Sequence, residues 1–570
     1  MSVEPPLDVV LCWHMHQPDY REPGGGEYVL PWTYLHAVKD YVDMAAHLEA
    51  VPEARAVVNF VPILLEQITD YARQVRAYLT EGGPIRDPLL AALASPALPT
   101  DPADRLKIIE SCLRANRERV IDRYPAFHRL AQMAGWLENH AAAVCYLSDR
   151  FLGDLLVWYH LGWLGETVHR GDVRAKRLVA KAQDFTLHDR YQLLELIGEL
   201  LGGIVERYRR LAQDGRIELS MTPYAHPIVP LLLDLQSARE AEPQLPMPEL
   251  TAYPGGAERA RWHVAEGLRV FEDHFGMRPA GCWPSEGGVS TAALDLLAGQ
   301  GMRWAATGEG VLANSLRAAG RRAPKDGKDW LYTPYRVGEQ GSHCFFRDDG
   351  LSDLIGFTYS DWHADDAVGD LAAHLERIAD AGDGRDGRIV SIILDGENAW
   401  EHYPENGFYF LSSLYRRLSR HPRLRLTTFS EHLDRAGAAP ALPRVVAGSW
   451  VYGSFTTWIG DRDKNRAWDL LGAAKAAYDR VLAAGGVTPE RLAALERQLG
   501  VCEGSDWFWW FGDYNPASTV SDFERLYRAQ LAGLYRLLGE EPPGELSEVL
   551  SHGGGAPRHG GAMRPGQARA

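Results

Sequence analysis

Residues 281–290 read Gly281-Cys282-Trp283-Pro284-Ser285-Glu286-Gly287-Gly288-Val289-Ser290. A short apolar run ends in the carboxylate of Glu286, and two glycines then allow a sharp turn of the backbone. Ser290 is placed to cap a helix that begins at Thr291. In α/β barrels and open parallel sheets, catalytic groups gather where strands give way to helices, because the loops there share one rim. The alternative interpretation is a carboxylate stabilised only by the N-terminal dipole of the following helix.

Six further stretches are predicted to be strands: 8–13, 56–61, 215–220, 302–306, 353–359 and 388–394. The runs at 8–13 and 388–394 are almost continuously apolar, as expected of parallel strands buried on both faces. Helical patterns separate most of the strands, and polar residues follow most of them. Seven strands alternating with helices predict an α/β fold, a seven-stranded (β/α)7 barrel.

Two regions depart from this alternation. Residues from about 62 to 214 are helical throughout, which predicts a long helical insertion beside or over the mouth of the barrel. We therefore expect a catalytic barrel over residues 1–440, including this insertion, and a C-terminal helical bundle over 441–540. The end of the chain is rich in glycine, proline and arginine, which predicts a disordered tail over 541–570.

Composition narrows the class of protein. The 570 residues carry a formal net charge of −16, which argues against a nucleic-acid partner. No apolar run reaches membrane-spanning length and no basic leader opens the chain, so we expect a cytoplasmic protein without a membrane partner. The six cysteines are scattered without a CxxC pair, which argues against both disulfides and a cysteine zinc site. Several of the 17 tryptophans stand beside carboxylates or histidines, where their faces can stack on sugar rings.

Polar residues at the predicted strand ends supply candidate site residues. The first strand runs into His14-Met15-His16-Gln17-Pro18, and a period of two places His14 and His16 on one side. Such histidines can bind a metal, donate to substrate hydroxyls or be solvated; without further zinc ligands nearby in the sequence, hydrogen bonding to a ligand is favoured. Glu218 interrupts the strand at 215–220, where a carboxylate needs either an ion-pair partner inside the barrel or the hydroxyls of a ligand.

Further carboxylates and aromatic residues follow the later strands. Asp395 is the first polar residue after 388–394, and Glu397 has the same parity, so the alternation leaves either one free to face the site. In residues 504–514, five aromatics in a row neighbour Asp506; this segment and the loops at 448–450 and 457–460 are candidates to close a substrate groove. Two carboxylates on strand ends, among tryptophans and histidines, are the parts of a glycosidase, in which one attacks the anomeric carbon and the other protonates the departing oxygen.

Five motifs in order resemble glycoside hydrolase family 57, over about residues 8 to 538. They are His14-Met15-His16-Gln17-Pro18, Gly215-Arg216-Ile217-Glu218, Trp283-Pro284-Ser285-Glu286-Gly287, Leu394-Asp395-Gly396-Glu397-Asn398-Ala399-Trp400-Glu401 and Ser505-Asp506-Trp507-Phe508-Trp509-Trp510. The resemblance implies a retaining enzyme of α-glucans on a seven-stranded barrel followed by a helical region. The family includes α-amylases, amylopullulanases, 4-α-glucanotransferases and branching enzymes, and the form of the third motif looks most like the amylopullulanase or α-amylase branch.

Carried to matching positions, the resemblance implies that Glu286 is the nucleophile and Asp395, rather than Glu397, the general acid/base. It also implies substrate-binding roles for His14, His16 and Glu218. Our remaining candidates for substrate binding are Gln17, Trp283, Asp361, His363, Trp400, Asp506 and Trp507.

The sequence thus predicts a retaining hydrolase of α-1,4 links in α-glucan oligo- or polysaccharides, with α-1,6 links as a further candidate and no metal or organic cofactor. One alternative is a 4-α-glucanotransferase or glycogen branching enzyme that uses the same two carboxylates. A second is a zinc-dependent α-mannosidase-like or deacetylase-like enzyme with His14, His16 and an aspartate as ligands. A third is a non-catalytic glycan-binding protein.

Overall fold

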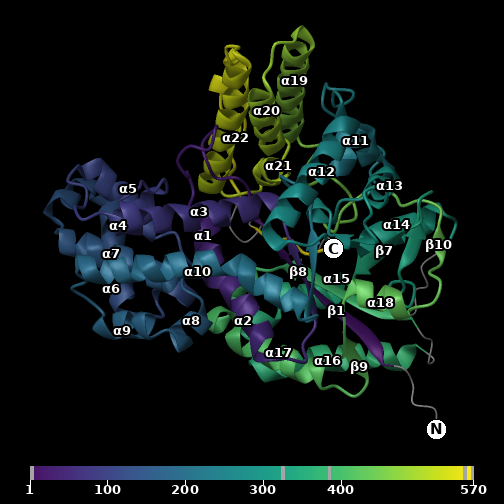
Figure 1. The fold of residues 1–570 in the computed structure, drawn as a ribbon, viewed down its shortest axis with the longest axis horizontal. Coiled ribbons are helices and arrows are strands. Elements are labelled where there is room, and N and C mark those ends of the chain that lie inside the picture. Colours follow the sequence, from purple (N-terminus) through teal and green to yellow (C-terminus); the bar gives the residue numbers. More distant parts are fainter. Residues whose placement is uncertain (1–5, 322–327, 383–386, 556–561, 567–570) are drawn as a thin grey trace.

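The computed structural model describes residues 6–321, 328–382, 387–555 and 562–566. Within these ranges, seven parallel strands form a closed barrel at the centre of the molecule (Figure 1). They are β1 (Leu7–Met15), β2 (Ala56–Phe60), β3 (Ile217–Met221), β4 (Gly281–Cys282), β5 (Trp304–Gly308), β7 (Ser342–Arg347) and β8 (Ile389–Asp395). Neighbours pair in this order, β8 returns to β1, and the pairing of Arg347 with Ser391 closes the ring between β7 and β8. The predicted seven-stranded barrel is confirmed.

One predicted strand is wrong. Residues 353–359 fall largely within helix α15 (Asp349–Phe357), and the sixth barrel strand is instead β7. Asp348 caps α15 by accepting a hydrogen bond from the backbone N–H of Leu351 at 2.9 Å. Leu351 and Ile355, four residues apart, form its buried face. A short apolar run fits a helix or a strand equally well, and here the preceding cap decides for the helix.

Three short strands extend the sheet beyond the barrel. Strand β6 (Tyr335–Val337) pairs antiparallel with β7, and β10 (Ala441–Leu442) continues from β6. Strand β9 (Leu424–Leu426) pairs with β1. After β9, helix α18 (Phe429–Arg435) begins with Phe429 inserted among the side chains that fill the barrel.

Alternation along the strands separates the barrel interior from the helical layer. Val10 and Cys12 of β1 pack with Val57, Ile389 and Ile393 in one interior cluster. Their neighbours along β1, from Val9 to Met15 in alternation, belong to the larger core under the helices. His14 and Asp395 continue the inward parity at the carboxyl ends of β1 and β8, where they are paired in register. The barrel therefore directs both side chains toward the opening at its carboxyl end.

Helices surround the barrel and extend from it on two sides. Between β2 and β3 lie α3 (Pro62–Glu81), α4 (Pro88–Ala94), α5 (Pro102–Cys112), α6 (Pro125–Trp136), α7 (Asp149–Gly162), α8 (Glu166–Gly171), α9 (Val173–Lys181) and α10 (Leu187–Gln213). Figure 1 shows most of these helices, in blue, on the left of the barrel. Around the barrel lie α1 (Trp32–His36), α2 (Val42–Ala50), α11 (Val229–Leu233), α12 (Gly256–Phe275), α13 (Thr291–Gly299), α14 (Glu309–Ala318), α16 (Ala364–Ala381) and α17 (Phe408–Ser419).

The C-terminal helices are α19 (Arg462–Ala484), α20 (Pro489–Cys502), α21 (Asp506–Trp510) and α22 (Ala517–Leu538), and they stand above the barrel in Figure 1. Glu503, at the end of α20, joins them to the barrel helix α12. Its buried carboxylate lies 2.8 Å from Arg259 Nη2 and 2.7 Å from His263 Nε2. Burial alone would raise the pKa of Glu503, but the charge of Arg259 and the hydrogen bonds from His263 and Arg259 lower it to about 2.

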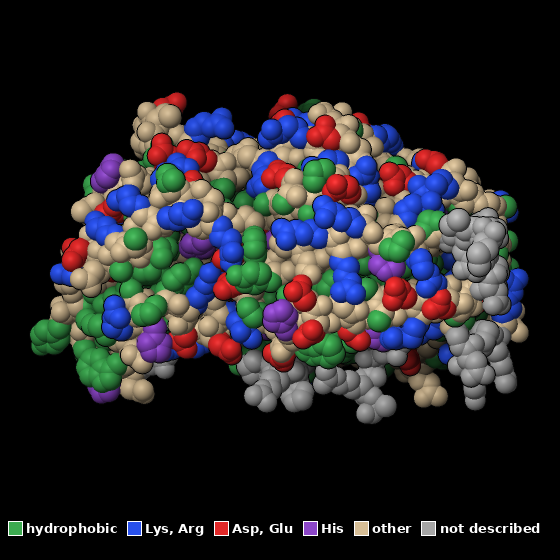
Figure 2. All heavy atoms as spheres, turned by 90° about the horizontal axis from the view of Figure 1, so that it is seen from below, with side chains coloured by type: hydrophobic (Ala, Val, Ile, Leu, Met, Phe, Trp, Pro, Cys, Tyr) green, Lys and Arg blue, Asp and Glu red, His purple; other side chains and the backbone are tan. Residues whose placement is uncertain are grey.

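The surface carries charges of both signs. On the face seen in Figure 2, basic and acidic side chains are interspersed, and neither sign forms a large continuous patch. None of the described helices combines the length and the apolar character that crossing a membrane requires.

We expect Glu503→Gln to lower the melting temperature, because the variant leaves the buried guanidinium of Arg259 without its counterion; breaking a buried pair in this way costs about 3–5 kcal/mol. The pKa of Glu503 falls from its usual 4.5 to about 2 on folding, so its contribution is present above pH 4.5 and is lost as the pH falls toward 2. Calorimetric melting of both proteins across this pH range measures the effect.

The matched control is Glu540→Gln, which removes an exposed ion pair with Arg480 at 3.2 Å. Exposed pairs contribute about 0–1 kcal/mol, so this variant should melt close to the wild type. Equal melting temperatures for Glu503→Gln and wild type at neutral pH would contradict the anchoring role of Glu503.

Candidate active site

A cavity of about 510 Å³ opens at the carboxyl ends of the barrel strands. The strand ends contribute His14, His16, Glu286 and Asp395 to its wall. The helical insertion contributes Arg114, Ala115, Asn116 and Trp163, and the C-terminal region contributes Trp450, Asp506, Trp509 and Trp510. Three parts of the chain that are far apart in sequence therefore enclose one site.

Glu286 sits on a strained turn between β4 and α13. Its backbone adopts the left-handed conformation, with φ 58° and ψ 24°. This conformation is energetically unfavourable for any residue other than glycine. A Cβ on the following Gly287, which also has positive φ, would lie only 2.8 Å from the Trp283 ring. The predicted cap of α13 is confirmed, because Ser290 accepts from Ala293 N–H at 3.2 Å. This turn aims the Glu286 carboxylate into the cavity.

Trp450 holds the Glu286 turn in place from the C-terminal side. Its indole Nε1–H donates to Glu286 Oε2 at 3.0 Å, and its backbone N–H donates to the Glu286 carbonyl at 3.1 Å. The Trp450 ring meets Trp283 edge to face, with ring centroids 5.3 Å apart. The indole donor favours the ionised form of Glu286.

Asp395 is the last residue of β8 and accepts from Asn398 Nδ2 at 2.9 Å. Glu397, which shares its parity, also lines the cavity and accepts from Gln17 Nε2 at 3.4 Å. Both carboxylates therefore face the site, and alternation alone does not separate their roles.

Burial and mutual repulsion raise the pKa of these carboxylates. Burial, together with the negative charge of Asp395, raises the pKa of Glu286 well above its usual range. Burial raises the pKa of Asp395 to about 6, against the lowering effect of its hydrogen bond from Asn398. Because each ionisation opposes the other, the first proton leaves the Glu286–Asp395 pair more easily than the second.

A chain of hydrogen bonds links the barrel to the C-terminal region through two histidines. His14 Nδ1 lies 2.7 Å from Asn59 Oδ1, an acceptor, so Nδ1 carries the proton of His14. His14 Nε2 then accepts from His226 Nε2 at 3.2 Å, and His226 Nδ1 accepts from the Ser505 hydroxyl at 2.8 Å. Burial lowers the pKa of His14 to about 3 and that of His226 well below its usual range, so both rings are neutral.

In the part of the chain that the structure describes, three residues are grouped closely enough to hold a metal ion: His16, His226 and Asp506, with ligand atoms within 4.8 Å of one another. Two histidines and a carboxylate suit a transition metal. Hydrogen bonds already engage these groups, since His16 Nε2 lies 2.8 Å from Asp506 Oδ1 and His226 bonds to His14 and Ser505. Among the ring nitrogens of the two histidines, His16 Nδ1 is buried and has no hydrogen-bond partner among the described residues. The absence of a metal requirement stays a prediction.

Of the predicted site residues, six line the cavity: His14, His16, Gln17, Glu286, Asp395 and Asp506. Glu218 does not. Its side chain points into the barrel, beside Val57 of β2 and two residues before Ser220 on β3. Its carboxylate accepts from Trp304 Nε1 at 2.7 Å and from Ser430 Oγ at 2.7 Å. Its carboxylate also accepts from the Ser430 backbone N–H at 3.0 Å near the start of α18, so its contacts connect β3 to that helix.

Three predicted tryptophans and two polar residues also lie outside the cavity wall. Trp283 fills the barrel interior, Trp400 packs edge to face on Trp13, and Trp507 packs on Tyr527 of α22; all three are fully buried. Asp361 and His363 are exposed beyond the end of α15, because the segment before them is a helix rather than a barrel strand.

The aromatic wall consists of other residues: Trp32, Trp163, Trp450, Trp509 and Trp510. The aromatic run at 504–514 and the loop at 448–450 signalled three of them, but neither Trp32 nor Trp163 was among the site residues predicted from the sequence. His226, which follows β3, and Arg347, the last residue of β7, also line the cavity. Their signal was their place at or shortly after the end of a strand, which the mistaken sixth strand hid for Arg347.

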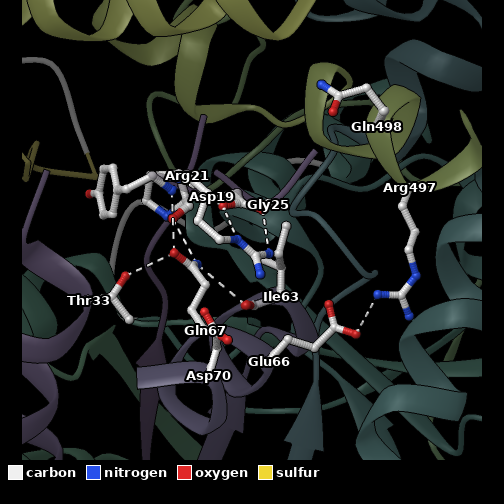
Figure 3. A network of polar contacts seen from close by, with 12 residues as sticks. Asp19, Arg21, Gly25, Thr33, Ile63, Glu66, Gln67, Asp70, Arg497 and Gln498 are labelled. Atoms are coloured by element: carbon white, nitrogen blue, oxygen red, sulfur yellow. Dashed lines mark hydrogen bonds and ion pairs between the residues drawn. The ribbon is translucent and has the colours of Figure 1, made fainter. Parts of the chain in front are cut away.

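The loop after β1, which carries His16 and Gln17, is fixed by Gln67 of α3 (Figure 3). Gln67 Nε2 donates to the Pro18 carbonyl at 2.9 Å. Its Oε1 accepts from Thr33 Oγ1 at 3.1 Å and from Tyr20 N–H at 3.3 Å. In the same view, Arg497 of α20 pairs with Glu66 of α3 at 2.9 Å, which ties α3 to the C-terminal helices.

Comparison with known proteins shows where this architecture recurs. The family model described as glycosyl hydrolase family 57 matches residues 10–442. Among solved structures, the chain is similar to a branching enzyme from Pyrococcus horikoshii, with 17% identity, a TM-score of 0.56, and coverage of 95% of this chain and 93% of that one. An α-amylase, AmyC, from Thermotoga maritima has 14% identity, a TM-score of 0.55, and coverage of 94% and 93%.

A second branching enzyme, from Thermococcus kodakaraensis and solved with glucose, has 16% identity and a TM-score of 0.55, with coverage of 96% of this chain and 94% of that one. At these identities the structural similarity shows the fold alone. No curated protein sequence matches the chain.

We expect Gln67→Leu to loosen the loop at 17–33, because it removes the partner of Tyr20 N–H and Thr33 Oγ1 inside the protein. Each buried polar group left without a partner costs about 1–3 kcal/mol. Faster hydrogen–deuterium exchange in this loop and a lower melting temperature measure the change. Gln213→Leu, at an exposed glutamine at the end of α10, is the control and should leave both unchanged. Unaltered exchange at 17–33 would reject the role of Gln67.

Proposed function

The chain belongs to glycosyl hydrolase family 57, and from this premise we propose that it is a retaining α-glucan enzyme with Glu286 as nucleophile and Asp395 as general acid/base. One observation carries the proposal: both carboxylates are partly buried, stand at or just after strand ends and face one cavity. Retention needs two carboxyl groups on either side of a single glycosidic bond. The resemblance of the sequence motifs supplies the division of roles.

In the first step, ionised Glu286 attacks the anomeric carbon while protonated Asp395 gives its proton to the departing glycosidic oxygen. The products are a glycosyl ester on Glu286 and a free sugar hydroxyl. In the second step, Asp395, now ionised, takes a proton from the attacking water, and the water oxygen displaces Glu286 from the anomeric carbon. A raised pKa of about 6 suits Asp395 to both proton transfers near neutral pH.

Trp450 favours the ionised form of Glu286 that the first step needs, against the burial that raises the pKa of this carboxyl group. Its indole donates to Glu286 Oε2 at 3.0 Å, which stabilises the carboxylate both before attack and as it leaves the sugar. The guanidinium of Arg347 lies against one face of the Trp450 ring. Arg347 is itself held by an ion pair with Asp349 at 2.7 Å. The positive charge of Arg347 also acts against the rise in the pKa of Asp395.

We propose hydrolysis of α-1,4 links, with α-1,6 links as a further candidate, as in the α-amylase or amylopullulanase branch that the Trp283-Pro284-Ser285-Glu286-Gly287 motif resembles. Gln17 and Asp506 line the cavity and offer polar atoms to sugar hydroxyls, while the tryptophans offer faces for stacking. In this proposal residues 1–440 form the catalytic unit with its insertion, residues 441–540 complete the cavity, and no metal or organic cofactor takes part.

Transfer is the second candidate: a sugar hydroxyl in place of water would make the protein a 4-α-glucanotransferase or a branching enzyme. The observation in its favour is the aromatic wall. Trp32 and Trp163 come from one side of the cavity, and Trp509 and Trp510 come from the C-terminal region. Stacking faces on several sides can hold an acceptor chain as well as a donor, and they reduce the access of water.

The role assignment predicts distinct kinetic effects. We expect Glu286→Gln to lower kcat/KM by about 10⁴-fold or more, because no glycosyl ester forms. Asp395→Asn should lose about 10²–10⁴-fold on maltooligosaccharides but far less on aryl maltosides with a good leaving group, which need little proton assistance. With azide, Glu286→Ala should give the β-glycosyl azide by one inversion, and Asp395→Ala the α-glycosyl azide by two.

The control for these variants is Glu272→Gln on the exposed end of α12, paired with Arg278 at 3.1 Å, whose kinetics should match the wild type. A β-azide from Asp395→Ala and an α-azide from Glu286→Ala would exchange the two roles. Full activity of Glu286→Gln would reject the site. All assays are repeated after exhaustive chelation, since loss of activity there would point to the His16, His226 and Asp506 group as a metal site.

Products from maltoheptaose separate hydrolysis from transfer. For a hydrolase we expect only chains shorter than seven glucose units and one new reducing end for each bond broken. Chains longer than the substrate, formed without a rise in reducing ends, would instead establish transfer. Chromatography combined with a reducing-sugar assay, on maltoheptaose, amylose and pullulan, measures both quantities and the linkage preference.

A further inference from the structure

The described end of the chain enters the candidate active site. Residues 562–566, which we call the tail segment, contribute Ala562, Met563 and Arg564 to the wall of the cavity that also contains Glu286 and Asp395. The sequence predicts a disordered tail from residue 541, whereas the structure gives residues 541–555 and 562–566 defined positions. Composition favours disorder when a segment has few apolar groups to bury, but a cavity elsewhere in the fold supplies a binding surface that composition does not reveal.

Arg564 makes the central contacts of the tail segment. Its guanidinium lies 4.6 Å from the centroid of the Trp509 ring and 4.4 Å from that of Tyr514. Its Nη1 donates to Thr457 Oγ1 at 3.5 Å. A flat guanidinium on an indole uses the same aromatic surface on which a sugar ring would stack. Trp509 lines the cavity, so Arg564 covers a surface suited to substrate.

The backbone of Gly566 fixes the end of the tail segment. Gly566 N–H donates to Asp353 Oδ2 of α15 at 3.0 Å, and its carbonyl accepts from Tyr452 N–H at 3.0 Å. Met563 packs against the edge of the main hydrophobic core. These contacts come from both the barrel and the C-terminal region, so the tail segment bridges the two across the cavity.

Charge explains why a cation settles there. Six carboxylates line the cavity: Glu286, Asp395, Glu397, Glu401, Asp506 and Asp522. Arg114, Arg347 and Arg564 are the lysine or arginine residues among the described lining, and Arg347 is already paired with Asp349 and Asp353. The positive charge of Arg564 counters part of the rise in the pKa of Glu286. The positive charge of Arg564 is therefore attracted by the excess of carboxylates in the cavity, which would repel an anion.

The tail segment is nevertheless held incompletely. Nε and Nη2 of Arg564 are buried, and neither has a hydrogen-bond acceptor among the described residues. A buried donor without a partner costs free energy that an exposed one does not. Ala562 is exposed, and Met563, Arg564 and Pro565 are only partly buried. A ligand that offers hydroxyl groups and a stacking ring can replace the contacts that Arg564 makes with the cavity wall.

We propose that residues 562–566 are an intramolecular competitor of substrate, which covers the Trp509 surface of the cavity until an α-glucan displaces it. This inference rests on the proposed function, since it names the Trp509 surface as a subsite for the same glucan. When a site is open for only a fraction of the time, the apparent dissociation constant rises by the inverse of that fraction. A tail segment docked for nine-tenths of the time would weaken binding about tenfold.

Binding without turnover tests the proposal. In a Glu286→Gln background, which keeps the substrate intact, the dissociation constant for maltoheptaose is measured by titration calorimetry for the full chain and for a variant that ends at residue 561. We expect binding to tighten about tenfold in the shorter variant. Arg564→Ala in the full chain should tighten it partly, since the Gly566 contacts remain. Arg480→Ala removes the same charge at an exposed site on α19 and should change nothing.

Two further readouts separate the possible failures. Equal affinities for maltoheptaose with and without residues 562–570 would overturn the inference. Weaker binding without these residues would overturn it as well, because the tail segment would then form part of the substrate site. Turnover of starch by the otherwise unmodified chain tests the proposed function by itself. Acrylamide quenching of tryptophan, measured without sugar, should increase when residues 562–570 are removed, and unchanged quenching would show that the tail segment does not cover Trp509.

Discussion

Repulsion between two partly buried carboxylates is the interaction around which this site is arranged. Glu286 and Asp395 face one cavity, and each raises the cost of ionising the other. The surroundings offset that cost only in part, through the indole of Trp450 on Glu286 and the amide of Asn398 on Asp395. Two carboxyl groups that lose their protons at different pH values can supply an acid and a nucleophile in one place, which is the requirement of retaining glycoside chemistry.

The closed barrel produces this pairing, and the segments outside it complete the cavity. Pairing of β7 with β8 closes the ring, and inward parity brings Asp395 beside His14 at the mouth. The positive φ of Glu286 turns its carboxylate toward the same opening. Trp450 and Asp506 come from the region after the barrel and bond directly to Glu286 and His16. The barrel alone would leave these site residues without their partners, so the C-terminal region is part of the site.

Buried polar groups with hydrogen-bond partners and those without partners have different roles in this fold. Glu218, His14, His226 and Glu503 are buried or partly buried, and each has hydrogen-bonding partners that hold its side chain in place. Arg564 is the contrasting case, with two buried nitrogens that lack acceptors in the described chain. Groups of the first kind resist displacement, whereas a group of the second kind is poised to exchange its contacts for those of a ligand.

The sequence by itself determined six of the seven barrel strands and the position of Glu286 and Asp395 at strand ends, because apolar runs and glycine-rich turns are local signals. It also placed Asp506 and the aromatic run among the candidates. Only the tertiary structure decided that 353–359 lies largely in a helix, that Glu218, Trp283, Trp400 and Trp507 lie outside the cavity wall, and that Trp32, Trp163 and Arg564 line the cavity. Those outcomes depend on which distant segments meet when the barrel closes, and a one-dimensional pattern records which residues can be buried but not which neighbours bury them.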